Sequence, residues 1–143
     1  MRDLDIRNLK PTRLYMPINK GERKMKKLFI SCPMKGRTEE NIRKSMEKMH
    51  KIAEIVFDQE LEVIPSYIEH NPPENSKEAV WYLGESIKKM AEADYFIGIG
   101  YTYYKGCNIE TEAARRYHIP SYHINMLNVV MPDIMDANDE EEF

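Results

Sequence analysis

Residues 94–112 constrain the fold more than any other stretch, because they join an apolar run, a glycine-bearing loop and a helical pattern in that order. The run Tyr-Phe-Ile-Gly-Ile at residues 95–99 is short and rich in aromatic and β-branched residues, which is typical of a strand. From Cys107 onward the apolar residues recur at helical spacing, and the expected buried stripe is Ile109, Ala113 and Tyr117. The carboxyl ends of parallel strands line a ligand crevice, so we expect Glu110, in the first turn of this helix, to face one.

The rest of the chain repeats this alternation of strand and helix. We expect further strands at residues 28–31, 61–64 and 122–124, and two amphipathic helices capped by Thr38 and Ser76. The apolar stripe of the first helix is Ile42, Met46, Met49, Ala53 and Val56, and that of the second is Val80, Leu83, Ile87, Met90 and Ala91. The pattern predicts an α/β protein with a three-layer, Rossmann-like (flavodoxin-like) domain and a four- to five-stranded, mainly parallel sheet. A reversal of strand order beside the first strand would bring together the loops that follow the first and third strands.

The two ends of the chain differ in charge from the α/β region. Residues 1–26 form a basic extension, in which residues 13–16 are a candidate edge strand, and residues 126–143 form an acidic tail. We expect the α/β domain to occupy residues 27–125. The basic extension has few aromatic side chains for stacking on bases, so we do not expect the protein to bind nucleic acid.

Composition argues against several other classes of protein. The chain has two cysteines, Cys32 and Cys107, which lack the spacing of a zinc site and follow no secretory leader. We therefore expect a cytoplasmic protein that uses neither a metal nor a cofactor. No apolar run approaches the roughly 18 residues that a membrane span needs, so we expect no membrane association.

The turn after the first strand contains the parts of an anion site. Lys35 and Arg37 flank Gly36, whose missing side chain lets backbone amides approach a ligand, and a helix N-terminus follows. A phosphate would fit there. The alternative is a structural turn whose charges are solvated, because the sequence matches neither a P-loop nor a dinucleotide-binding glycine motif.

Glu110 has two interpretations. A carboxylate held over a sugar ring can attack the anomeric carbon as the base departs, which would make Glu110 a nucleophile. The alternative is an acidic residue that stabilises the N-terminus of a helix. Glu112 lies about 200° further around the helix, so only one of the two can face the crevice.

Four short motifs resemble those of the nucleoside 2-deoxyribosyltransferase superfamily. They are Phe29-Ile-Ser-Cys-Pro-Met34-Lys-Gly36, Ala93-Asp94, Gly106-x-x-x-Glu110-x-x-x-Ala114 and Ile119-Pro120. The similarity covers about residues 27–125. It implies an enzyme that hydrolyses the N-glycosidic bond of nucleoside monophosphates or exchanges nucleoside bases, in which Glu110 forms a glycosyl-enzyme intermediate. It also implies that the loop after the first strand holds the nucleoside or its phosphate.

The chain departs from the family pattern at three positions. Cys32 stands where members usually have a glycine, and Tyr104 stands where they have a serine or aspartate that contacts sugar or phosphate. Ser86 stands where a further acid is common. Tyr101, Tyr103 and Tyr104 could stack on a base instead, or could pack against the sheet and a subunit boundary.

We therefore expect either a nucleoside or nucleotide N-glycosidic bond hydrolase or 2-deoxyribosyltransferase, or a non-catalytic protein that binds a nucleotide or an ADP-ribose-type ligand on the same fold. The expected catalytic residue is Glu110. The expected substrate-binding residues are Cys32, Pro33, Met34, Lys35, Gly36, Arg37, Ser86, Tyr101, Tyr104, Gly106 and Asn108. The resemblance also implies a homodimer or larger homo-oligomer. A third hypothesis is a regulatory interaction protein that uses its charged ends.

Overall fold

A computed structural model describes residues 25–100 and 102–129 of the 143-residue chain. Its elements in chain order are β1 (Lys26–Ile30), α1 (Glu39–Phe57), β2 (Leu61–Val63), α2 (Glu78–Met90), β3 (Tyr95–Ile99), α3 (Lys105–Arg116), β4 (Ser121–Ile124) and the short α4 (Met126–Val129). The expected edge strand at residues 13–16 lies outside the described residues. So do most of the two charged extensions. No periodic pattern follows Asn125 in the sequence, so α4 corrects the expectation that residues 126–129 belong to an irregular tail.

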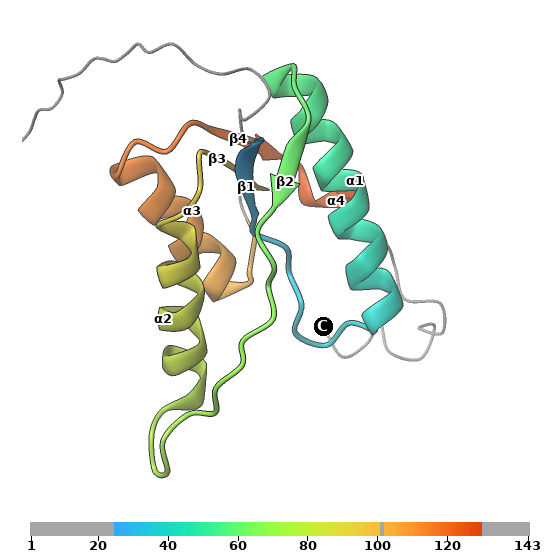
Figure 1. Ribbon diagram of the computed structural model, residues 1–143. Helices are drawn as coiled ribbons and strands as arrows, with labels where there is room; N and C mark the ends of the chain where they lie inside the picture. The colour runs from blue at the N-terminus through green and yellow to red at the C-terminus, as the bar shows by residue number, and fades with distance from the viewer. Residues whose placement is uncertain (1–24, 101, 130–143) are drawn as a thin grey trace, which may run out of the picture.

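The four described strands form one parallel sheet in the order β2-β1-β3-β4. Helices α1 and α4 cover one face of this sheet, and α2 and α3 cover the other (Figure 1). The expected three-layer, Rossmann-like α/β fold is confirmed. The chain passes from β1 to β2 on one side and then returns to β3 on the other side of β1, so the ends of β1 and β3 lie next to each other.

The alternation of side chains along the strands divides the core between the two faces. Leu28 and Ile30 pack with Met49 and Ala53 of α1. Phe29 faces the other way, toward Met90 and Ala114, and its ring lies 5.7 Å from that of Phe96, its partner in β3. The residue that continues this second face beyond β1 is Ser31. The pleat of β1 therefore directs Ser31 toward the layer of α2 and α3.

One of the two expected helix caps is confirmed. The Thr38 hydroxyl accepts a hydrogen bond from the Asn41 amide at 3.1 Å and begins α1 as expected. Ser76 is not a cap. Its hydroxyl donates to the carbonyl of Pro73 at 2.7 Å, and α2 begins after Lys77 without a side-chain cap. The carbonyl of Pro73, in the turn that precedes Ser76, competes with the amides of the helix for this hydroxyl.

The expected buried stripes are wrong at several positions, which are exposed in the structure. Val80 is 66% exposed because the N-terminal half of α2 extends beyond the strands (Figure 1), where it has no sheet to pack on. Ile109 is 48% and Tyr117 80% exposed, because α3 turns its Cys107 and Ala114 side toward the core instead. The other two exposed members of the predicted stripes are Val56 and Ala91.

Candidate active site

A carboxylate joins three elements at the end of the sheet where β1 and β3 finish. Glu110 of α3 accepts a hydrogen bond from the Ser31 hydroxyl at its Oε1, with an O···O distance of 2.7 Å. Its Oε2 accepts from the Ser86 hydroxyl of α2 at 2.6 Å. Ser31 directly follows β1 and lies 79 positions from Glu110 in the sequence. The expected proximity of Glu110 to the turn after the first strand is therefore observed.

The start of α3 explains why Glu110 faces inward. We expected the helix near Cys107 with Glu110 in its first turn, but α3 begins at Lys105, so Glu110 is its sixth residue and belongs to the second turn. Cys107 and Ala114, three residues before and four after, are buried on the same face of the helix. Glu110 therefore lies on the face of α3 that packs inward. The sequence pattern places it on the flank of that face, because it takes Ile109 and Tyr117 as buried residues.

Burial dominates the electrostatics of Glu110. It raises the pKa of this carboxyl above its ordinary value, and the hydroxyls of Ser31 and Ser86 offset part of that rise by bonding the ionised form. Among the described residues no cation contributes to this shift. Ionised Glu110 is thus a partly buried negative charge that two neutral donors stabilise.

Glu112 has the opposite environment. Its carboxylate is solvent-accessible and pairs with Arg115 at 2.6 Å and Arg116 at 2.5 Å. Hydrogen bonds from these two guanidinium groups lower the pKa of Glu112 to about 2. Of the two acids that the sequence left as competitors, Glu110 is the one that faces the end of β1.

Both cysteines lie beside this carboxylate site as free, buried thiols. Burial raises the pKa of Cys107 to about 12, and the nearby Glu110 carboxylate contributes in the same direction. Burial also raises the pKa of Cys32, although Arg37 partly opposes it. Since thiolates and not thiols are nucleophilic, neither cysteine competes with Glu110 as a nucleophile at neutral pH.

The turn after β1 uses its arginine internally. The Arg37 guanidinium donates to the carbonyl of Pro33 at 2.8 Å, to the Ser45 hydroxyl at 2.7 Å and to the carbonyl of Asn41 at 3.2 Å. Gly36, with φ of +77°, supplies the left-handed backbone that this turn needs. At Arg37 these bonds support the interpretation of this segment as a structural turn. Phosphate binding by Lys35 and the backbone amides stays a prediction.

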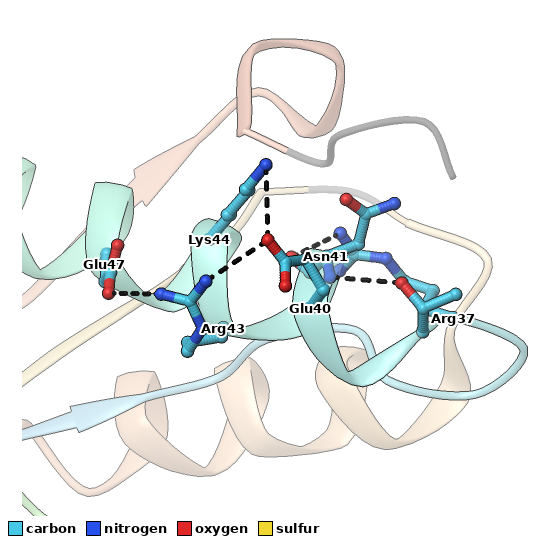
Figure 2. A network of polar contacts seen from close by, with 7 residues as sticks. Arg37, Glu40, Asn41, Arg43, Lys44 and Glu47 are labelled. Carbon is cyan, nitrogen blue, oxygen red and sulfur yellow. Dashed lines mark hydrogen bonds and ion pairs between the residues drawn. The ribbon is translucent and has the colours of Figure 1, made fainter. Parts of the chain in front are cut away.

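Acidic side chains also surround the helix terminus that follows this turn. Glu40 pairs with Arg43 at 3.3 Å and with Lys44 at 3.5 Å, and Arg43 also pairs with Glu47 at 2.9 Å (Figure 2). Glu39 precedes Glu40 in the first turn of α1. These carboxylates weaken the attraction of this terminus for a phosphate, because they already complement the positive end of the helix dipole.

The remaining expected site residues occupy the start of α3. Tyr104 is half-buried and stacks on Tyr103 with ring centroids 4.9 Å apart. The Asn108 amide donates to the carbonyl of Thr102 at 2.7 Å, which braces the loop, and Gly106 has open space where a side chain would be. Tyr101 lies outside the described residues. Met34 and Lys35 are exposed, whereas Cys32 and Pro33 are buried beneath them.

Ser31, which donates a hydrogen bond to Glu110, is not among the site residues that the sequence predicts. The signal for it was present, because it belongs to the Phe29-Ile-Ser motif and shares its strand face with Phe29. Only the tertiary structure shows that this face continues to Glu110.

Two surface hollows lie elsewhere on the molecule. One of about 540 Å³ lies between α1 and the ends of β1 and β2, with Ile30, Met46, His50 and Val63 in its wall, and another of about 410 Å³ borders β4. Neither is lined by Glu110.

Two further observations concern the part of the chain that the structure describes. It contains no group of three or more histidine, cysteine or acidic residues arranged to hold a metal ion. None of its helices combines the length and apolar character needed to cross a membrane.

Comparison with protein-family models, with curated proteins and with solved structures finds no match for this chain. The function proposed below rests on the geometry of the site and on the motif resemblance.

The buried charge of Glu110 predicts a pH-dependent effect on stability. A carboxyl whose pKa is raised by folding favours the folded state at acidic pH, and this contribution is lost as the pH rises through the folded-state pKa. We therefore expect Glu110→Gln to have a larger free energy of unfolding than the wild type near neutral pH. Urea denaturation should show this difference shrinking as the pH falls toward about 4, the ordinary range of a glutamate.

Glu112→Gln is the matched control, because it makes the same change two residues further along the same helix, at a solvent-accessible carboxylate. Its effect should have the opposite sign, since the lowered pKa of Glu112 stabilises the folded state at neutral pH. A wild type that is more stable than Glu110→Gln at every pH would contradict the account of the buried charge.

Proposed function

We propose that this protein cleaves the N-glycosidic bond of a nucleoside or nucleotide, with Glu110 as the nucleophile. The observation that carries the proposal is the Glu110 carboxylate, fixed by Ser31 and Ser86 at the ends of two neighbouring parallel strands. Ligands of open α/β sheets bind at this position in the fold. The hydroxyls hold the side chain in one orientation, which favours attack at a defined carbon.

The chemistry follows from a carboxylate in this setting. One oxygen of Glu110 attacks C1′ of the sugar, the bond from C1′ to the base nitrogen breaks, and its electron pair leaves with the base. Water then attacks C1′ of the glycosyl ester to complete hydrolysis, or a second base does so to complete transfer. Only ionised Glu110 can attack, so the rate should rise with pH through its raised pKa.

The motif resemblance supports this assignment from the sequence side. Glu110 matches the family nucleophile, and Ser31 comes from the motif that follows the first strand. The two motifs are far apart in the chain, yet their side chains are hydrogen-bonded in the folded domain. If the motifs matched the family by chance, there would be no reason for Ser31 and Glu110 to lie in contact.

A non-catalytic ligand-binding protein is the second candidate. Both carboxylate oxygens of Glu110 already accept hydrogen bonds from neutral hydroxyls, and Tyr104 replaces a polar contact that the family pattern supplies. A nucleotide or an ADP-ribose-type ligand would then bind without turnover. This candidate predicts a rise in melting temperature with added ligand while the ligand is recovered intact.

We also propose that the protein forms a homodimer or larger homo-oligomer through α2. Val80 and Tyr82 are exposed apolar side chains on the part of this helix that extends beyond the sheet. Light scattering after size-exclusion chromatography should give an oligomeric mass for the wild type and a smaller mass for Val80→Lys. Ile55→Lys, at an apolar position of α1 that is also exposed, should retain the oligomeric mass. A monomeric wild type would refute this proposal.

Replacement of Glu110 tests the catalytic proposal. Glu110→Gln keeps the shape of the side chain but removes the nucleophilic oxygen anion, so release of free base should fall roughly a thousandfold or more. Glu112→Gln should retain activity. Chromatography of a panel of nucleosides and nucleotides incubated with each variant measures this. Equal base release by the wild type and Glu110→Gln would exclude Glu110 as the nucleophile, and intact ligand with a raised melting temperature would favour the binding protein.

A further inference from the structure

Among the residues that the structure describes, the groups around Glu110 are poorly suited to give a proton to a departing base. The nearest side chain on α2 is Ser86, whose hydroxyl donates its proton to Glu110 Oε2 at 2.6 Å and so is already engaged. Ser31 is engaged in the same way at Oε1. An alcohol is a far weaker acid than the carboxylic acids and imidazoles that usually serve as general acids.

The other titratable groups that face this cluster come from the turn after β1 and from the start of α3. Cys107 and Cys32 are buried thiols with raised pKa values, and burial also raises the pKa of the Tyr104 hydroxyl. The Arg37 guanidinium donates to backbone carbonyls and to Ser45. The raised pKa values mean that the two thiols and the Tyr104 hydroxyl hold their protons tightly, which is the opposite of what a proton donor needs.

Whether the reaction needs a proton donor depends on the leaving base. A purine or pyrimidine attached through a neutral nitrogen departs as an anion unless an acid protonates it, and such assistance contributes about 10² to 10⁴ in rate. A pyridinium base already carries a positive charge on its glycosidic nitrogen. It departs as a neutral molecule and needs no proton.

We propose that the substrates of this site are N-ribosyl pyridinium nucleosides or nucleotides, the class in which the base is a nicotinamide-like cation. This inference rests on the proposed function and adds the substrate class to it. The structural basis is a buried carboxylate whose two hydrogen-bond partners are the alcohols of Ser31 and Ser86.

Charge complementarity supports the same class of ligand. Ionised Glu110 is a partly buried anion, and no cation among the described residues contributes to the shift of its pKa. A buried charge without a counter-charge is costly, and an opposite charge placed beside it in a low-dielectric site offsets that cost. A pyridinium substrate supplies the positive charge in the ground state. The oxocarbenium-like transition state keeps positive charge beside Glu110 as the base becomes neutral.

The reaction balances without a further reactant other than water. A Glu110 carboxylate oxygen forms a bond to C1′ while the bond from C1′ to the pyridinium nitrogen breaks, and the electron pair of that bond neutralises the nitrogen. Water then attacks C1′, the ester bond to Glu110 breaks, and the carboxylate is restored. One molecule of water is consumed, and the products are the neutral base, the free sugar or sugar phosphate, and one proton.

The test compares substrates whose bases differ in charge, and the oxidised and reduced nicotinamide forms differ in little else. The probes are nicotinamide mononucleotide and its riboside, the corresponding reduced dihydropyridine forms, and the neutral nucleosides inosine and uridine. Base release is measured by chromatography, with the rate of Glu110→Gln subtracted and each substrate normalised to its spontaneous hydrolysis. We expect kcat/KM for a pyridinium substrate to exceed that for its reduced form and for inosine by about a hundredfold or more.

Ser86→Asp provides a second readout, because it places a stronger acid where the Ser86 hydroxyl stands. The ratio of inosine cleavage to nicotinamide mononucleotide cleavage should rise by about tenfold or more in this variant. The wild-type comparison is independent of whether this variant folds.

The outcomes separate the two proposals. Preferential cleavage of the pyridinium substrates supports the inference. Cleavage of inosine or uridine at an equal or greater normalised rate, still abolished in Glu110→Gln, would overturn the substrate class but leave the proposed function in place. Absence of cleavage of every probe would overturn both.

Discussion

The hydrogen bonds of one buried carboxylate define the end of the sheet at which β1 and β3 finish. Glu110 draws together the residue after β1, the middle of α2 and the second turn of α3. Charged hydrogen bonds of this length are stronger than neutral ones, and they offset part of the cost of removing the carboxylate from water. The position of α3 relative to α2 therefore depends on this charge as well as on the apolar contacts of Met90 and Ala114.

Burial of Glu110 has opposite consequences for stability and for chemistry. The raised pKa means that ionisation at neutral pH opposes folding. The same burial leaves an anion with few bonds to water, which is more reactive toward an electrophilic carbon and more attractive to a cation. Carboxyl groups with perturbed pKa values concentrate at functional sites in proteins. Glu112 differs from Glu110, because its carboxylate pairs with Arg115 and Arg116 at the surface. Its ionisation therefore favours the folded state.

Local patterns predicted most of the fold, and the site only in part. The four strands and the parallel sheet followed from alternating strand and helix signals, and the cap at Thr38 followed from its own side chain, because both depend on nearby residues. The phase of α3 was wrong, since Tyr117 and Ile109 fit a helical stripe but the sheet contacts another face. Ser31 and Ser86 could not be identified as partners of Glu110 from local sequence, because their hydrogen bonds depend on how α2 and α3 pack on β1.

The central claim is that Glu110 bonds covalently to the sugar during turnover. Substrates fluorinated at C2′ destabilise the oxocarbenium-like transition states and can allow a glycosyl ester to accumulate. The most direct measurement is peptide mass spectrometry of the protein quenched in acid after exposure to one neutral and one pyridinium 2′-fluoronucleoside. The account predicts a mass gain of one fluoroglycosyl group on Glu110. Release of base with the label on another residue, or with no labelled protein at any time, would contradict it.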